Sequence, residues 1–399
     1  MTLESQKIRY RRRLAAATAA AAAVTAAGLA ASGTASASPA TAPVLQTMTY
    51  TATGLGGNLY RPVGVSAFNG TVYASNTGAN LLAALANGST TVVAGSLSAY
   101  GEHGDGGKAV NASLYHPGGT AEDAKGDIFI ADSGDNVVRE ITVAGVIQLI
   151  AGTGKAGLGH AGPATRSALD HPQNVAVDAQ GDVFIADTYN NRVVKVTPKG
   201  QVTAVAGNGA AGYSGDGGRA ASARLNEPTG LALDSKGNLF IADSANNVIR
   251  RVDAKTGVIT TVAGDYAADK ASDGLGGFSG DGGPATSAQL NDPQGVALDG
   301  AGDLFIADTF NNAIREVTPG GTISTVVNAA PAAGGAPPAG GETSGGAPTA
   351  SKLNTPYGVT IDPGTDSLYV ADTTNSKIAD VTGLAQSGSA AGPTAPSQS

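Results

Sequence analysis

The sequence predicts an all-β protein: a six-bladed β-propeller of four-stranded antiparallel blades, with the ring closed by the N-terminal strand. One pattern of short apolar runs and turns occurs six times, and repeats of this kind pack radially around an axis. Each copy contains one marker proline, and successive markers lie 55, 55, 56, 65 and 63 residues apart. These prolines are Pro62, Pro117, Pro172, Pro228, Pro293 and Pro356.

The fifth copy shows how a single repeat is built. Its apolar runs are residues 295–298, 304–307, 313–317 and 322–327, and they are separated by DGAGD, DTFNN and TPGG. Asp, Asn, Gly and Pro favour turn geometry, so the pattern predicts four strands joined by tight turns. A single meander cannot cover both of its faces, so each copy needs a neighbour on either side.

The two ends of the repeat region complement each other. Residues 44–53, VLQTMTYTAT, have the pattern of a fourth strand but no first three strands before them. The sixth copy ends after Val381 without a fourth strand of its own. We therefore expect the N-terminal strand to complete the last blade, which removes an open sheet edge.

The segments outside residues 44–382 are assigned by composition. Residues 1–37 combine a basic start, an Ala-rich apolar stretch and a small-residue cleavage motif, which predicts a signal peptide and a secreted, extracellular product. The sequence leaves Sec and twin-arginine export open. A retained membrane anchor is the alternative, and the Ala-rich stretch disfavours it. Residues 38–43 are expected to form a flexible leader and residues 383–399 a disordered tail.

Composition excludes several functions. The chain has 24 basic and 32 acidic residues, which argues against a nucleic-acid partner. It has no cysteine, which excludes disulfides, zinc–thiolate sites and a thiol nucleophile. We expect a monomer with no stable membrane anchor.

A polar column follows the second strand of each repeat. In three of the copies an Asn pair follows the column residue three and four positions later: Asn190 and Asn191, Asn246 and Asn247, and Asn311 and Asn312. Such side chains bond nearby backbone amides and tolerate left-handed conformations, so we interpret the column as turn chemistry, with a ring of metal ligands as the alternative. The column consists of Asn76, Asp132, Asp187, Asp243, Asp308 and Asp372.

A second motif, GDGG, lies in the long loops that connect repeats. It places Asp105, Asp216 and Asp281 among glycines, and the aligned positions in two other loops are His160 and Ser344. We expect each Asp to bond backbone amides of its glycine turn before one short helical turn. The alternative is a calcium site, although one carboxylate per loop falls short of the six or more oxygens that calcium needs.

Polar residues gather at the axial mouth, directly before the marker prolines. His116 and His171 occupy the same position in adjacent repeats, and Asp170 adjoins His171. We treat this rim as the candidate binding site without a cofactor. Alternatively, His116, His171 and Asp170 bind zinc or calcium, or supply a general base. The same two columns also contain Asn226, Glu227, Asn291, Asp292 and Asn354.

The segments IADTYNNRV, IADSANNVI and IADTFNNAI, with loops such as GYSGDGGRAASARL, resemble the NHL repeat family, in particular the teneurin-type and bacterial exported NHL propellers. This resemblance implies a six-bladed propeller that binds proteins, glycans or other ligands. Some NHL-like propellers are amidating lyases with zinc histidines directly after the marker proline, and no histidine stands there in this chain.

From these features we expect a non-catalytic binding or scaffold module. Its partner, a protein or a glycan, would contact the long-loop face, where the inter-repeat loops and the turns between strands two and three meet. The alternative is a metal-assisted lyase or hydrolase with its active site at the axial mouth. The low-complexity loop 329–352 also belongs to this face.

Overall fold

The computed structural model describes residues 44–48, 51–52, 59–96, 103–271, 274–328 and 352–382. The predicted signal peptide, leader and tail lie outside these residues, as does the loop 329–352 except for its last residue. Within the described part of the chain, no helix has both the length and the apolar character needed to cross a membrane.

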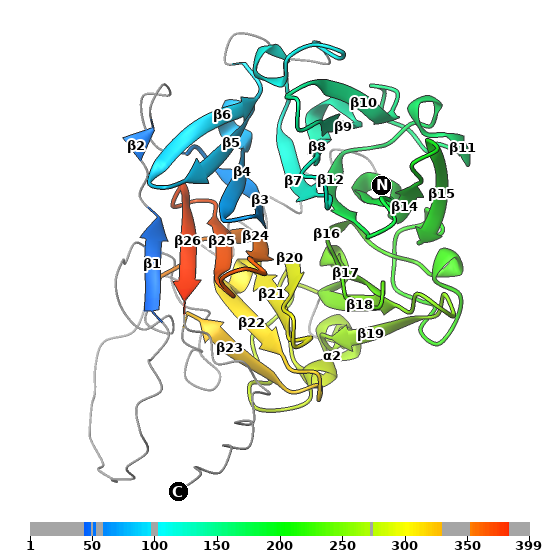
Figure 1. Cartoon of the computed structure of the whole chain (residues 1–399). Coiled ribbons are helices and arrows are strands. Elements are labelled where there is room, and N and C mark those ends of the chain that lie inside the picture. Colours follow the sequence, from blue (N-terminus) through cyan, green and yellow to red (C-terminus); the bar gives the residue numbers. More distant parts are fainter. Residues whose placement is uncertain are drawn as a thin grey trace, which may run out of the picture.

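Six small antiparallel sheets form a ring, which confirms the six-bladed β-propeller (Figure 1). Blade 1 contains β3 (Pro62–Phe68), β4 (Thr71–Asn76), β5 (Leu81–Ala86) and β6 (Ser89–Ala94). Blade 2 contains β7 (Pro117–Glu122), β8 (Ile128–Asp132), β9 (Val137–Ile141) and β10 (Ile147–Gly152). Blade 3 contains β12 (Pro172–Val177), β13 (Val183–Asp187), β14 (Arg192–Val196) and β15 (Gln201–Ala206).

The second half of the ring repeats this plan. Blade 4 contains β16 (Pro228–Leu233), β17 (Leu239–Asp243), β18 (Val248–Val252) and β19 (Ile259–Ala263). Blade 5 contains β20 (Pro293–Leu298), β21 (Leu304–Asp308), β22 (Ala313–Val317) and β23 (Ile323–Val327). Blade 6 contains β24 (Pro356–Ile361), β25 (Leu368–Asp372), β26 (Lys377–Thr382) and β1 (Val44–Met48). The short strands β2 (Thr51–Ala52) and β11 (Gly162–Pro163) extend the outer edges of blades 1 and 3.

The first strand of every blade lies at the axis, where each contacts its counterparts in the two adjacent blades. These strands begin at the marker prolines, two residues earlier than the apolar pattern in the fifth repeat indicates. A proline has no backbone N–H to donate, so it suits the start of an edge strand. Close packing at the axis also requires glycine: a Cβ on Gly295 would approach the Tyr357 carbonyl oxygen to 2.2 Å.

The ring closes as the sequence predicts. Strand β1 pairs antiparallel with β26, from Val44 opposite Thr382 to Met48 opposite Ile378. Figure 1 shows this junction as the dark-blue strand beside the red one. The N-terminal strand thereby covers the β26 edge, which would otherwise present unpaired backbone groups.

Apolar side chains fill the space between adjacent blades. The alanine that precedes the column Asp is fully buried in five successive blades, for example Ala186 and Ala242, and it lets neighbouring sheets approach closely. The cluster between blades 3 and 4 includes Leu225, Ile241 and Ile259, each with no exposed surface. Because both faces of a blade are covered in this way, its strands are apolar on both sides.

The turns between second and third strands are single turns of 3₁₀ helix. These are η1 (Thr77–Ala79), η3 (Ser133–Asp135), η5 (Thr188–Asn190), η7 (Ser244–Asn246) and η9 (Thr309–Asn311). Short helical turns in the inter-blade loops are η2 (Ala109–Asn111), η4 (Ala164–Arg166), η6 (Ala220–Ser222) and η8 (Ala285–Ser287), and α2 spans Tyr266–Ala271. The residue after each of the five second-to-third-strand turns is an Asn in the left-handed conformation, as predicted.

Each of these turns also bonds the next blade. The Ser or Thr that follows the column residue donates its hydroxyl to the carbonyl of the next marker proline, as Ser244 does to Pro293 at 2.6 Å. The left-handed Asn accepts the N–H of the residue before that proline, as Asn247 does from Asp292 at 2.7 Å. We call this pair of bonds the inter-blade latch. At the closure between blades 6 and 1, Thr373 and Ser376 make the same contacts.

We predict that a chain beginning at Thr49, which lacks β1 and keeps β2, is less stable than one beginning at Val44. Loss of β1 removes its backbone bonds to β26, which at typical net values lowers the free energy of unfolding by about 2–4 kcal/mol. Urea denaturation followed by circular dichroism measures the difference. Identical unfolding midpoints for the two chains would contradict the closure.

Candidate functional site

The rim of the axial mouth is a ring of six residues in one unusual conformation. The residue before each marker proline has φ between 48° and 51°, although none is glycine. This left-handed region is costly for an ordinary side chain, and the inter-blade latch holds the backbone there. The rim residues are Arg61, His116, His171, Glu227, Asp292 and Thr355.

The row one residue earlier is also fixed through its backbone. Asp170 donates its N–H to the carboxylate of Asp187 at 2.8 Å, and Asn226 and Asn291 do the same with Asp243 and Asp308 at 2.7 Å. The N–H of Asn354 bonds Asp372 in the same way. The side chains of these four residues are half-buried, and the residues that the sequence places at the axial mouth lie in these two adjacent rows.

Two histidine–tyrosine pairs stand on the rim of blades 2 and 3. The rings of Tyr115 and His116 are stacked with centroids 4.3 Å apart, and those of His171 and Tyr189 lie 4.6 Å apart. His171 Nδ1 is 3.1 Å from Asp170 Oδ1. Burial lowers the pKa of His116, and the nearby His171 and Arg61 lower it further. Of the predicted candidates, the structure therefore brings His116, His171 and Asp170 into one neighbourhood.

The rim is asymmetric in charge and in aromatic content. Arg61 and the two histidines come from blades 1–3, whereas Glu227 and Asp292 come from blades 4 and 5. Three tyrosines are exposed on the first half: Tyr60 by 59%, Tyr115 by 37% and Tyr189 by 37%. The sequence reasoning did not single out these tyrosines, although two of them lie two residues before a marker proline.

No group of three or more His, Asp or Glu side chains in the described residues is arranged to hold a metal ion. His116, His171 and Asp170 are near one another without forming such a group. The rim can stack against rings and can donate and accept hydrogen bonds.

The column Asp residues have a larger role than turn formation. Asp243 accepts the N–H of Asn226, the side-chain amide of Asn246 at 2.8 Å and a guanidinium N–H of Arg250 at 3.3 Å. The backbone donor lies 17 residues away in the chain, so the expectation of bonds to backbone amides of the adjacent turn is wrong. The Asp instead joins the rim, the turn and the third strand at one buried point.

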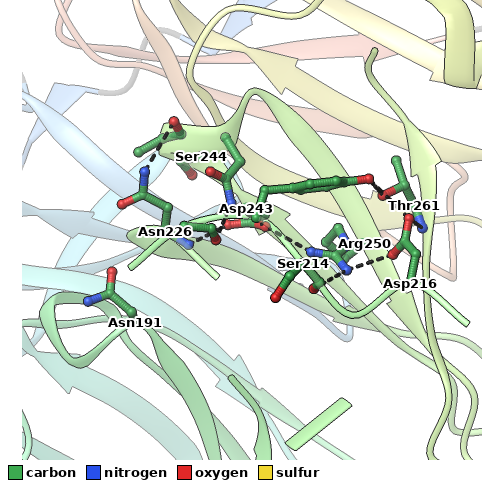
Figure 2. A network of polar contacts seen from close by, with 12 residues as sticks. Asn191, Ser214, Asp216, Asn226, Asp243, Ser244, Arg250 and Thr261 are labelled. Carbon is green, nitrogen blue, oxygen red and sulfur yellow. Dashed lines mark hydrogen bonds and ion pairs between the residues drawn. The ribbon is translucent and has the colours of Figure 1, made fainter. Parts of the chain in front are cut away.

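The aspartate of the GDGG loop contacts the same buried arginine (Figure 2). Arg250 has no exposed side-chain surface and lies between Asp243 and Asp216, with Asp216 Oδ1 at 2.6 Å. Asp216 also accepts the N–H of Thr261, and the Tyr213 ring stacks on the guanidinium at 4.7 Å. Asp105 with Arg139 and Asp281 with Arg315 repeat this arrangement at 2.9 and 2.7 Å.

The interpretation of the GDGG carboxylate is therefore corrected. Its chief partner is an arginine of the third strand, and the backbone amide of the glycine turn bonds a glycine carbonyl instead, as Gly218 does with Gly215. The sequence did contain a signal. Arginine stands seven residues after the column Asp in the three GDGG repeats and in no other repeat. Blade 3, which has His160 in the loop and Val194 in the strand, uses Arg192 to reach Asp187 at 2.7 Å.

Burial is the largest influence on the pKa of the column residues Asp132, Asp243 and Asp308. Burial raises the pKa of Asp243 and of Asp308 to about 6, and the arginine and amide partners oppose that rise. Burial raises the pKa of Asp132 to about 8, where Asp135 replaces the usual Asn and adds a like charge. The outer carboxylate behaves oppositely at Asp216, whose pKa lies below its ordinary value because Arg250 and the surrounding donors outweigh its partial burial.

Comparison with known sequences identifies this architecture. The family model described as the teneurin NHL domain matches residues 96–160, 209–274 and 276–372, more than half of the chain. The chain belongs to the teneurin NHL domain family. The NHL repeat model also matches residues 169–196, so the predicted resemblance is confirmed.

The relatives of this NHL domain are parts of much longer proteins. Human Teneurin-4 is 31% identical over 234 residues, which is 53% of this chain and 8% of Teneurin-4. SUPPRESSOR OF QUENCHING 1 from Arabidopsis thaliana is 38% identical over 90 residues, 22% of this chain and 8% of that protein. The matched region is thus a small fraction of either relative.

Solved structures share the fold of this NHL domain at low sequence identity. A protein of unknown function from Bacteroides thetaiotaomicron has a TM-score of 0.60 at 15% identity, covering 86% of this chain and 76% of that one. An auxiliary nutrient binding protein from the same organism has a TM-score of 0.59 at 14% identity, covering 85% and 76%. At this identity the likeness concerns architecture alone.

We predict that Arg250→Met destabilises the propeller strongly, because it leaves Asp243 buried without its cation. Breaking a buried ion pair from one side typically costs about 3–5 kcal/mol. The matched control is Arg251→Met on the same strand, whose pair with Asp253 lies at the surface and should contribute little to stability. Urea unfolding measures the stability of both variants. Equal losses of stability would contradict the proposed role of Arg250 between Asp243 and Asp216.

Proposed function

We propose that this chain is an exported, non-catalytic NHL propeller that binds a partner through its long-loop face. The observation that carries the proposal is the axial rim: six residues fixed in one backbone conformation, with three exposed tyrosines over one half. A rim held in place by backbone bonds loses little conformational freedom when a partner binds, which favours recognition.

The chemistry of the rim indicates the kind of partner. Tyrosine rings bury a large area at low entropic cost and are over-represented among the residues that dominate binding energy. Beside them, Arg61 and the histidine pairs supply hydrogen-bond donors, and the opposite half of the rim supplies the carboxylates of Glu227 and Asp292. A protein segment or a glycan with complementary polar groups fits this surface.

A metal-assisted lyase or hydrolase is the competing function. The 3.1 Å contact between His171 and Asp170 would suit a general base. A metal mechanism needs a third ligand, and the described residues contain no group of three that could hold a metal. Binding is therefore the function we favour, and chemical change of a captured ligand is the outcome to test against.

The experiment is a screen of the full-length secreted protein against a glycan array and a displayed peptide library. A ligand found there is then titrated against the triple variant Tyr60→Ala, Tyr115→Ala, Tyr189→Ala. We expect at least a tenfold loss of affinity, since each exposed tyrosine that acts as an anchor contributes about 1 kcal/mol or more.

The control is Val143→Ala, at a residue that is 72% exposed in the short turn between the third and fourth strands of blade 2, away from the rim. Its affinity should match that of the unmodified protein. Equal affinity for the triple variant and the control would contradict the proposal. Recovery of a cleaved or rearranged ligand, detected by mass spectrometry together with stoichiometric zinc or calcium, would favour the enzyme instead.

A further inference from the structure

A separate feature of the propeller is the cavity along its axis. Its volume is about 240 Å³, and it is lined by residues of all six inner strands, β3, β7, β12, β16, β20 and β24. Sites for drug-sized molecules have roughly 300–1,000 Å³. The cavity therefore suits a small ligand.

The lining has two chemically distinct sectors. Blades 4–6 contribute mainly apolar residues, with Thr360 as the polar exception, and blades 1–3 contribute a polar sector of Ser66, Thr120, Glu122 and Asn174 beside small apolar residues. The apolar sector consists of Leu231, Leu233, Val296, Leu298, Val359 and Ile361. A ligand filling the cavity would meet aliphatic side chains on one side and hydrogen-bonding groups on the other.

The polar sector is a local departure from the repeat. Glu122 is the fifth residue after its marker proline, and the equivalent residues of the other five repeats are all apolar, such as Leu233 and Leu298. Thr120 likewise stands where the other repeats have Val or Leu. The fold itself does not need these polar residues, because five blades form the same strand without them.

Hydrogen bonds orient the polar sector. Ser66 donates its hydroxyl to Glu122 Oε1 at 2.6 Å, and the Thr120 and Ser66 hydroxyl oxygens are 2.7 Å apart. A serine hydroxyl has one proton, so Thr120 is the donor to Ser66. The chain Thr120–Ser66–Glu122 thus directs two hydroxyl dipoles toward the carboxylate, which supports a negative charge there.

That carboxylate has no counter-charge from the cavity lining. Glu122 is the only ionisable residue among the lining residues, and burial raises its pKa to about 7. A buried carboxylate is normally compensated by a cation. A ligand with a protonated amine would supply the missing charge, and its apolar body would cover the aliphatic sector.

We infer that the axial cavity is a binding site for a small amphipathic amine, with Glu122 as the anchor of its ammonium group and the side chains of blades 4–6 as the receptor for its aliphatic body. The anchor is placed by Ser66 and Thr120. This site is independent of the partner that we propose for the long-loop face.

Few other titratable groups lie near Glu122, so the titration of this carboxyl group can be followed on its own. Tyr73 of β4 is electrostatically coupled to it, and the pKa of Tyr73 lies above its usual value of 10, so the phenol stays neutral near pH 7. The flanking strands β3 and β12 have no ionisable residue, and Asp132 lies at the far end of β8 on Arg139. In the turn after Glu122, Lys125 lies within salt-bridge distance of Asp123 and Asp127.

The test is isothermal titration of the full-length protein with cyclohexylamine, cyclohexanol and cyclohexanecarboxylate. The amine should bind most tightly and the carboxylate not at all. A carboxyl group with a pKa near 7 is about tenfold more ionised at pH 8 than at pH 6, so the affinity for the amine should rise about tenfold over that range.

Glu122→Gln and Glu122→Leu should each weaken amine binding at least tenfold at pH 8 and abolish its pH dependence. Glu122→Leu restores the side chain of two other repeats, so it tests the site without threatening the fold. Glu316→Gln is the matched control, because burial raises the pKa of Glu316 to about 7 as well, yet Glu316 lies on β22 outside the cavity. This control should bind the amine as the unmodified protein does.

Three outcomes would overturn the inference: no amine binding at millimolar concentration, unchanged amine affinity in both Glu122 variants, or carboxylate binding as tight as amine binding. None of these outcomes depends on the tyrosines of the rim. The proposal for the cavity and the proposal for the long-loop face are therefore tested independently.

Discussion

The rest of the propeller depends on one repeated set of bonds, made at the end of the second strand of each blade. In five blades a buried Asp there, and in blade 1 Asn76, accepts a backbone N–H from the row beside the rim of its own blade, as Asp243 does from Asn226. The following hydroxyl residue and the left-handed Asn hold the next blade through two further bonds, as Ser244 and Asn247 do. Most other contacts between blades are apolar and have no preferred direction, so these hydrogen bonds help to fix the angle between neighbouring blades.

The same bonds couple architecture to function. Every latch ends on the backbone of a rim residue, which leaves the rim side chain free to vary: Arg61, His116, Glu227 and Thr355 share one conformation and differ in chemistry. The GDGG loops add the buried arginines on the outer side, and the axial strands add Glu122 on the inner side. A constant frame therefore presents variable chemistry in two places, the mouth and the cavity.

The fold could be predicted from the sequence because the same pattern of strands and turns occurs in all six repeats. Period, turn residues and the strand predicted at 44–53 were sufficient for blade number and closure. Only residues 44–48 pair with β26, and residues 51–52 pair with β6 of blade 1 instead. The role of Asp216 could not be read in the same way, since its partner Arg250 is 34 residues away in the chain and only the joint occurrence of the two residues indicates their contact. Four of the six rim residues, His116, His171, Glu227 and Asp292, were found because they adjoin the prolines, whereas Arg61 and Thr355 were missed. Glu122 was missed because a single charged residue in an apolar column resembles surface variation.

The central claim is that the rim amides are held by the preceding blade, and native-state hydrogen exchange of those amides tests it most directly. The account predicts strong protection for His116, His171, Glu227, Asp292 and Thr355, whose N–H groups lie 2.7–3.0 Å from an Asn side-chain oxygen. Arg61, 3.4 Å from Ser376 Oγ, should exchange fastest of the six. Exchange of all six at the rate of unstructured loop amides would contradict the account.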